Sequence, residues 1–429
     1  MIRTARLDSR SQVILESVEH TEVASLGLWN FHGSRDEASA EAGCSHFLEH
    51  MLFKGTGRRS AFQIAQEIER VGGYLNAFTE KEVTCFHCTL PAAEVALAVD
   101  VLSDMYFHST LDPREIEKEK AVVLNEIQAA EDSPEEKAHQ LYIEGLWDGH
   151  TLSRKITGES RDVQAITPAT LERFYRRFYT PESTVISASG DLEPQALLEE
   201  LNRRFAAGAP PRLGSGAAGA ESTAIAGRRP PVRRRSWELK PDKFEQVQLY
   251  TGVSYPGARV ASEYYKDLVF NTLFGESMSS RLFQHLREDK GLCYTVYSFR
   301  SYFTDASLWT IYANTAPTAL TALLDGLDAE LGRLRSEPPT AKEVEDAKSQ
   351  IRGGMILAKE DMENRMKRLF RMYHLTDRVA EQEESLALLA GVDRDDVIEF
   401  SQRLQPEAFN LMAYGSRGAK KMKRKTFSF

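Results

Sequence analysis

The sequence has 429 residues, a formal net charge of −9, 42% hydrophobic and 27% charged residues, and four cysteines. This length predicts two or three domains with their own hydrophobic cores, and the composition is that of a soluble globular protein. Without a run of eighteen apolar residues no membrane span is expected, and so few cysteines do not make a disulfide framework.

The charge distribution bears on partners and location. An acidic chain favours cationic substrates over nucleic acid. Two basic clusters, at 228–235 and 420–425, would suit an anionic surface, but a solvated linker and a frayed tail are the simpler interpretation. Residues 1–8 lack the apolar core of a signal peptide, so we expect a cytoplasmic protein.

Two strand-like runs, at 13–15 and 23–29, precede a helix expected to begin near Gly43. A second helix, at 61–71, stops at a pair of glycines and leads into an extended stretch at 74–79. These segments surround the motif that carries the chemistry.

The first of these helices carries the sequence His-Phe-Leu-Glu-His at positions 46–50. His46 and His50 are one helical turn apart and share a face. Two neutral imidazoles at this spacing can bind one metal ion, usually zinc. Glu49 points towards the same face, where a carboxylate would accept a proton from metal-bound water, and the pattern is the H-x-x-E-H arrangement. The alternative is that these residues share one helix by chance.

The next motif is Cys85-x-x-Cys88, which could suggest a redox or zinc site. Residues 83–90 have the pattern of a strand, and positions three apart on a strand point to opposite faces. We therefore interpret both cysteines as structural.

A helix is predicted to begin at Asp112 and Pro113 and to continue to about residue 130. Glu119 and Glu126 are seven residues apart on it, which places both carboxylates on one face. Two histidines and one glutamate form a known catalytic zinc ligand set. A solvated helix face remains the alternative for either glutamate.

Helices are expected over most of 92–204, apart from a strand at 184–189. From 206 to 226 the chain is mostly Ala, Gly, Pro and Ser, and an arginine-rich run continues to 235. We therefore predict a catalytic domain at 1–205, a linker at 206–235 and a second domain at 236–429.

The second half repeats features of the first. The segments 181–190 and 406–415 both begin with Pro-Glu and end with Gly after a short apolar strand, and 406 − 181 = 225 gives their offset. The segments 115–117 and 343–345 correspond at an offset of 228. The mixture of strands and long helices indicates the α+β class.

At the offset of 228, Ala347 takes the place of Glu119 and Gly354 that of Glu126. The second half has lost the carboxylates of the first. Only the first half is therefore expected to hold a metal.

Together these motifs resemble the M16 (pitrilysin, or inverzincin) metallopeptidases, which include mitochondrial processing peptidase and insulin-degrading enzyme. In that family the third zinc ligand is a glutamate 76 positions after the second histidine, and 126 − 50 = 76 identifies Glu126. A further family glutamate lies seven positions earlier, at Glu119. Segments 33–37 and 53–56 match the family as well.

The resemblance implies one Zn²⁺ per chain, held by His46, His50 and Glu126, with Glu49 as general base and Glu119 in a supporting role. It also implies two homologous α/β-roll halves, each an antiparallel sheet covered by helices, that form a clamshell on dimerisation. The expected activity is endoproteolysis of unfolded peptides in a closed chamber.

The resemblance extends to substrate binding. The family's counterpart of 74–79 is an edge strand to which the peptide adds, so Asn76, Ala77 and Phe78 are candidate binding residues. An Arg and a Tyr seven apart, here Arg287 and Tyr294, bind the substrate carbonyl in the family. An ordinary edge strand and a surface ion pair are the alternatives.

Larger family members contain four such halves, which implies a partner for this chain. A homodimer is expected, because one chain carries both the metal set and the Arg/Tyr pair. The main alternative is a non-catalytic scaffold or assembly subunit of the same fold, as in respiratory-complex core proteins. A zinc-storing protein is a third, but it would leave Glu49 unexplained.

Overall fold

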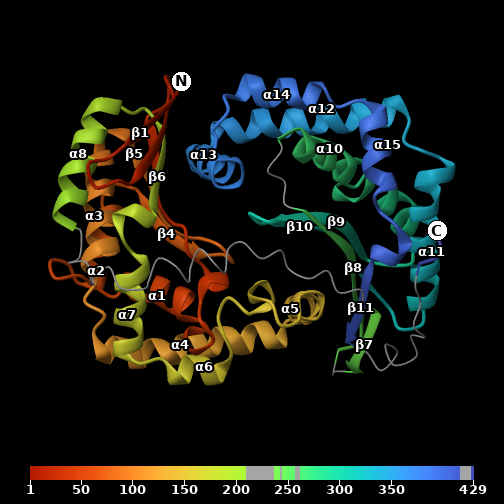
Figure 1. Ribbon diagram of the computed structural model, residues 1–429, viewed down its shortest axis with the longest axis horizontal. Helices are drawn as coiled ribbons and strands as arrows, with labels where there is room; N and C mark the ends of the chain where they lie inside the picture. The colour runs from red at the N-terminus through yellow and green to blue at the C-terminus, as the bar shows by residue number, and fades with distance from the viewer. Residues whose placement is uncertain (209–235, 242–243, 257–260, 416–426) are drawn as a thin grey trace. The chain divides into compact units, whose positions relative to one another are not determined.

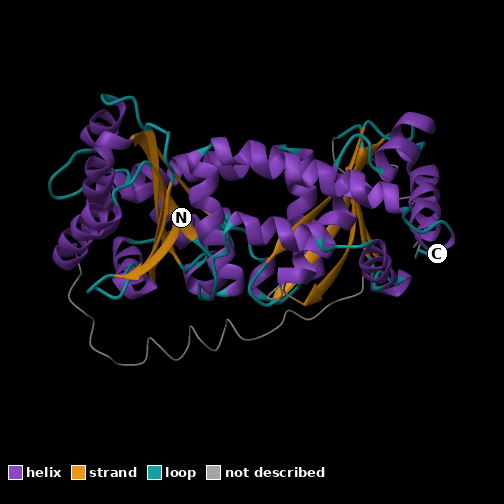
Figure 2. Cartoon of the chain, turned by 90° about the horizontal axis from the view of Figure 1, so that it is seen from above, coloured by secondary structure: helices purple, strands orange, loops and turns teal. Residues whose placement is uncertain are grey.

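The structure is a computed structural model of the chain, and it describes residues 1–208, 236–241, 244–256, 261–415 and 427–429. Each half of the sequence forms one β-sheet, and helices cover the strands (Figure 2). The fold belongs to the α+β class with two similar halves, as predicted. No helix in the described part of the chain is long and apolar enough to cross a membrane.

Figure 1 labels the helices of the first half and its strands other than β2 and β3. Its strands are β1 (Ile2–Arg6), β2 (Gln12–Ser17), β3 (Val23–Asn30), β4 (Tyr74–Thr79), β5 (Thr84–Pro91) and β6 (Thr184–Gly190). Its helices are α1 (Cys44–Leu52), α2 (Ala61–Glu69), α3 (Val95–His108), α4 (Pro113–Asp132), α5 (Pro134–Leu146), α6 (Ser160–Ala165), α7 (Pro168–Phe178) and α8 (Pro194–Gly208).

The second half follows the same scheme. Its strands are β7 (Ser236–Pro241), β8 (Val247–Pro256), β9 (Thr295–Tyr302), β10 (Ala306–Thr315) and β11 (Asn410–Gly415). Its helices are α10 (Ala261–Asn271), the π-helix η7 (Phe283–Asp289), α11 (Leu320–Ser336), α12 (Ala341–Leu357), α13 (Met362–Thr376), α14 (Gln382–Ala390) and α15 (Arg394–Gln402).

The two sheets have the same topology. The first has the order β1-β2-β6-β3-β5-β4 and the second β7-β11-β8-β10-β9. Without β1, the orders correspond strand for strand. Each sheet also has one parallel pair, β2 with β6 and β7 with β11, while the other pairs are antiparallel. This confirms the duplication that the repeated segments predicted.

The glycine that ends each repeated segment has a steric reason. Gly190 and Gly415 have φ angles of 142° and 124°, a region that residues with a Cβ rarely adopt. A Cβ at Gly190 would lie 2.2 Å from the carbonyl oxygen of Val23, and one at Gly415 would lie 2.3 Å from that of Gln246. Both halves therefore require glycine where the sixth and eleventh strands end.

Contacts divide the chain into two compact units, and each unit includes a helix from the other half of the sequence. Of the described residues, the first unit contains 1–129, 154–208 and 357–381, and the second contains the others. Helix α13 therefore covers a face of the first sheet, where Phe370 stacks on Trp29 with ring centroids 3.9 Å apart. Helix α1 packs in the core on the opposite face.

Helix α5, from the first half of the sequence, belongs to the second unit. Its buried residues Tyr142 and Leu146 pack in one cluster with Tyr250 and Met412 of the second sheet. Most of the predicted linker, 209–235, lies outside the described residues, so the division at 1–205 and 236–429 stays a prediction.

Strand β5 places the two cysteines of the C-x-x-C motif as its spacing predicted. Cys85 packs in the cluster with Trp29, whereas Cys88 packs in the core on the other face. Both thiols are free and buried. Burial raises the pKa of Cys88 to about 12, which suits a packing role rather than a reactive one.

Candidate metal centre

Helix α1 is fixed by its apolar face. Phe47, Leu48 and Met51 are fully buried in the first core, and the helix begins after Gly43, whose φ is 84°. A Cβ at Gly43 would lie 2.6 Å from the carbonyl oxygen of Thr157. The face opposite the core is left to the three polar residues of the motif.

A buried carboxyl group holds the start of α1. Glu37 is 1% exposed, and its two oxygens accept hydrogen bonds from the backbone N–H groups of Gly43 and Ser45, at 2.8 and 2.7 Å. These donors would otherwise be unpaired at a helix N-terminus. Sequence reasoning assigned no role to Glu37, because the contact depends on how the loop before the helix folds back.

We expect Glu37→Ala to lower the free energy of unfolding by about 1–3 kcal/mol, since it leaves buried N–H groups without a partner. Urea denaturation would measure the change. Glu69→Ala, which removes an exposed carboxylate from α2, is the matched control and should leave the midpoint nearly unchanged. Equal effects of the two substitutions would contradict the capping role.

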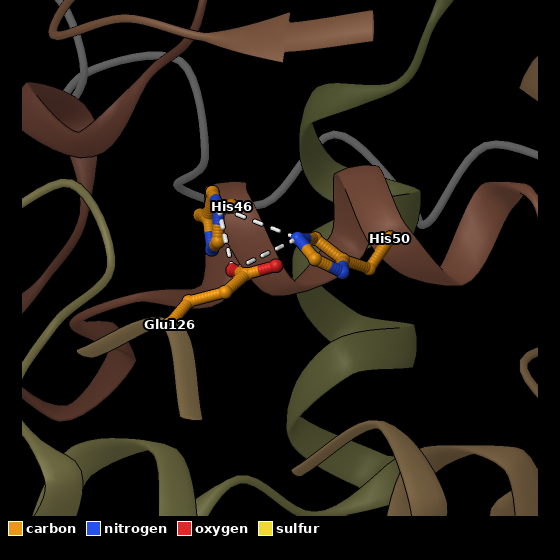
Figure 3. Close-up of side chains that lie close together, drawn as sticks. All are labelled: His46, His50 and Glu126. Atoms are coloured by element: carbon orange, nitrogen blue, oxygen red, sulfur yellow. Dashed lines mark hydrogen bonds and ion pairs between the residues drawn. The ribbon is translucent and has the colours of Figure 1, made fainter. Parts of the chain in front are cut away.

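The three predicted ligands converge. Nε2 of His46 lies 3.4 Å from Nε2 of His50, and Oε2 of Glu126 lies 3.7 Å and 3.5 Å from these nitrogens (Figure 3). A tetrahedral zinc ion with bonds of about 2.0–2.1 Å keeps its ligand atoms about 3.4 Å apart. The donor set and its spacing therefore fit zinc.

The surroundings of His46 favour its neutral imidazole, the form that can bind a metal ion. Burial, with a smaller contribution from His50, lowers the pKa of His46 to about 4. His46 is therefore neutral at physiological pH and offers a lone pair rather than a proton. Metal binding does not have to compete with protonation there.

The other carboxylate on α4 has a different position. An Oε1 atom of Glu119 lies 2.8 Å from Nδ1 of His50, and its Oε2 lies 2.5 Å from Nζ of Lys54. Its side chain is 5% exposed, against 44% for Glu126. Burial raises the pKa of Glu119, but the bonds from Lys54 and His50 outweigh this and lower it overall. An ionised Glu119 fixes the His50 ring with Nε2 towards the cluster.

The carboxyl group of Glu49 lies beside the cluster of His46, His50 and Glu126. Its Oε2 accepts a hydrogen bond of 2.5 Å from the hydroxyl of Thr79, at the end of β4. Burial raises the pKa of Glu49, while the bond from Thr79 and the nearby His50 act in the opposite direction. Sequence reasoning did not find Thr79 or Lys54 as contacts of the motif.

The candidate binding strand is an edge of the first sheet, since β4 pairs with β5 alone. The side-chain oxygen of Asn76 accepts a hydrogen bond of 2.8 Å from the N–H of Ala77. Phe78 packs edge-on against Trp29, with ring centroids 5.6 Å apart. The strand is thus placed as the edge that was expected, and its use by a substrate stays a prediction.

Arg287 and Tyr294 lie in the second unit. The guanidinium carbon of Arg287 is 5.3 Å from the ring centroid of Tyr294 and 4.5 Å from that of Phe283. Tyr294 is 73% exposed. The structure therefore brings this pair together with an accessible phenol.

Two family models match the sequence. Residues 12–160 match insulinase (peptidase family M16), and residues 165–351 match the peptidase M16 inactive domain. The chain is 33% identical over 419 residues to the "uncharacterized zinc protease YmxG" of Bacillus subtilis, covering 97% of this chain and 99% of the relative. It is also 33% identical to an "uncharacterized zinc protease" of Streptomyces coelicolor, covering 92% and 85%.

Solved structures show the same fold. A protease from Helicobacter pylori superposes with a TM-score of 0.86 at 19% identity, over 97% of this chain and 99% of that one. A structure described as the peptidase M16 inactive domain from Pseudomonas fluorescens gives 0.87 at 18% identity, over 97% and 98%. A chain of complex III2 from Candida albicans gives 0.79 at 15% identity, over 97% and 96%. At these identities the likeness concerns the fold alone.

Proposed function

Because this chain belongs to peptidase family M16, we propose that it is a zinc-dependent endopeptidase that cleaves unfolded peptides. The observation that carries the proposal is the convergence of His46, His50 and Glu126 within 4.8 Å of one another. One Zn²⁺ per chain would be held there. A carboxyl group placed beside the cluster, that of Glu49, supplies the base that hydrolysis needs.

Each residue has a defined task in this proposal. Zinc, when bound, supplies a positive charge that lowers the pKa of a water molecule. Glu49 accepts the proton of the attacking water and then delivers it to the leaving amine, and Thr79 holds its carboxyl group in place. Glu119 orients His50 through Nδ1.

The peptide adds as a strand to the free edge of β4, at Asn76, Ala77 and Phe78. Backbone pairing of this kind gives affinity with little demand on sequence. Arg287 and Tyr294 donate hydrogen bonds to the substrate carbonyl, and the exposed phenol of Tyr294 supports that role.

The active form is a cytoplasmic homodimer, since two chains bring together the four halves of the larger family members. Sedimentation at working concentration should give twice the chain mass of 48.3 kDa. A monomer with full activity would reject this part of the proposal.

Metal removal tests the proposal directly. We expect a chelator to abolish turnover of a quenched, unstructured peptide, and one equivalent of Zn²⁺ per chain to restore it. Metal content by atomic spectroscopy and the rate should rise together during readdition. If the protein binds zinc but cleaves no peptide, the scaffold alternative would be favoured. That alternative is considered because a chain of complex III2 has the same fold.

A further inference from the structure

We propose that helix α13 forms a charged subsite along the edge of β4, and that Arg371 selects an acidic side chain of the substrate close to the cleaved bond. The inference rests on the proposed peptidase function, because it assumes that a peptide pairs with β4. It adds the chemical class of a substrate side chain. All residues involved belong to the first unit.

Some backbone groups of β4 point away from β5, to the free edge of the sheet. The N–H of Ala77 is bound by the neighbouring Asn76 side chain rather than by β5. Since successive residues of a strand direct their N–H and C=O groups to opposite sides, Leu75, Ala77 and Thr79 present theirs at the free edge. A peptide strand would pair with these three residues and would replace the Asn76 side chain as the partner of the Ala77 N–H.

The side chains of β4 reach different helices on the two faces of the sheet. Thr79 lies on the face that reaches Glu49 of α1. Residues of a strand alternate between faces, so Tyr74, Asn76 and Phe78 lie on the other face, which α13 covers. A peptide added to β4 alternates in the same way. Every second substrate side chain therefore lies on the side of α13.

A stripe of charged side chains on α13 follows β4. Glu363 accepts a hydrogen bond from the hydroxyl of Tyr74, at the start of the strand. One turn later, Nζ of Lys367 lies 5.1 Å from the ring centroid of Phe78. After a further turn, Arg371 lies 3.7 Å from Glu80, just beyond the end of the strand. Residues four apart on a helix share a face, so one edge of α13 borders β4 over its length.

The charged side chains of this stripe differ in how accessible they are to a ligand. Glu363 is 17% exposed and already bound by Tyr74 and, at 2.6 Å, by Lys367. Arg371 is 63% exposed, and its contact with Glu80 is long. The pairing with Glu363 also occupies Lys367, so the charge most open to a ligand is the positive charge of Arg371. It lies at the end of β4 where Thr79 contacts Glu49, which is the end next to the reacting bond.

Binding of labelled peptides tests the inference without turnover. The protein is the full chain with Glu49→Gln, loaded with zinc, so that the peptide is not cleaved. The probes are short unstructured peptides, otherwise neutral, with a single Glu, Gln or Lys moved through successive positions. At one position we expect Glu to bind about fivefold tighter than Lys, since ion pairs between partly exposed groups are modest. The difference should shrink as salt is added.

The matched variants are Arg371→Glu and Arg3→Glu, each added to the same background. Arg3 is exposed on β1, at the opposite edge of the same sheet, so both variants change the net charge equally. Arg371→Glu should reverse the preference to favour Lys, whereas Arg3→Glu should leave it in place. A preference that survives Arg371→Glu, or no charge preference at any position, would overturn the inference.

Turnover separates this inference from the proposed function. Cleavage of the Gln peptide by the chain with intact Glu49 would support the peptidase whatever the charge preference. Charge-selective binding without cleavage would reject the peptidase and retain the subsite. Cleavage without charge-selective binding would reject the subsite alone.

Discussion

Replacing Glu49 by Gln is expected to lower kcat for peptide hydrolysis by about 10²–10⁴-fold, the usual contribution of a general acid–base group. The amide has nearly the same shape and retains an oxygen that can accept the bond from Thr79, but it cannot take a proton at neutral pH. Zinc content should stay at one per chain, because Glu49 is not one of the three converging ligands. Turnover of a quenched peptide and metal analysis of the same sample measure both quantities.

The control for this substitution is Glu69→Gln, which removes an exposed carboxylate of α2 in the same unit. It should leave both rate and zinc unchanged. Thermal unfolding of the two variants should agree within a few degrees, since glutamine has nearly the same size as Glu49 and can keep the hydrogen bond from Thr79. A Glu49→Gln protein that cleaves at the rate of the unsubstituted chain would contradict the assignment.

The local part of the centre was predictable because it depends on helical spacing. Helix α1 forms where the motif predicts it, and His46 and His50 meet one turn apart. Helix α4 likewise begins at Pro113, as the capping residues indicate. These are short-range features, and the sequence contains all the information that they need.

Spacing alone could not assign the two carboxylates of α4. Glu119 and Glu126 share a face in the sequence pattern, yet one binds Nδ1 of His50 and the other lies at its Nε2. Only the family resemblance separated their roles. Thr79 and Glu37 contact the motif helix from other segments, and nothing in their own neighbourhood indicates this.

The sequence pattern also could not predict which sheet helices α5 and α13 would cover. Helices α5 and α13 are amphipathic, but an apolar helix face does not specify which sheet it will cover. The described contacts place α13 on the first sheet through Phe370 and Trp29. The charged edge of α13 therefore borders β4, although the two segments are almost 300 positions apart, with Tyr74 and Glu363 separated by 289.

A non-catalytic scaffold would not require the residues that converge at the candidate metal centre. A subunit that only assembles with others has no need for a carboxyl group held by Thr79 beside three converging ligands. Here Glu49, the ligands and the partner of His50 are all present together. The second half, which the inactive-domain model matches as far as residue 351, has Ala347 and Gly354 at the positions that correspond to Glu119 and Glu126. Neither residue offers a carboxylate.

The second large effect is expected for Glu126→Gln, compared with Glu119→Gln. Both substitutions remove one negative charge from α4. In the proposed site Glu126 would supply a ligand oxygen, since its Oε2 lies 3.5 Å from Nε2 of His50. Its loss should leave a two-histidine site that does not retain zinc through dialysis against a chelator. Glu119 acts on the outer nitrogen of His50, and its loss should weaken zinc affinity by about 10–100-fold.

Competition with a chromophoric chelator gives the zinc dissociation constant of each variant without reference to catalysis. Excess zinc should restore much of the activity of Glu119→Gln and little of that of Glu126→Gln. Identical zinc affinities in the two variants would contradict the division between ligand and positioning residue. If Glu119→Gln lost more zinc affinity than Glu126→Gln, the two roles would have to be exchanged. Glu119 would then be the third ligand and Glu126 the positioning residue.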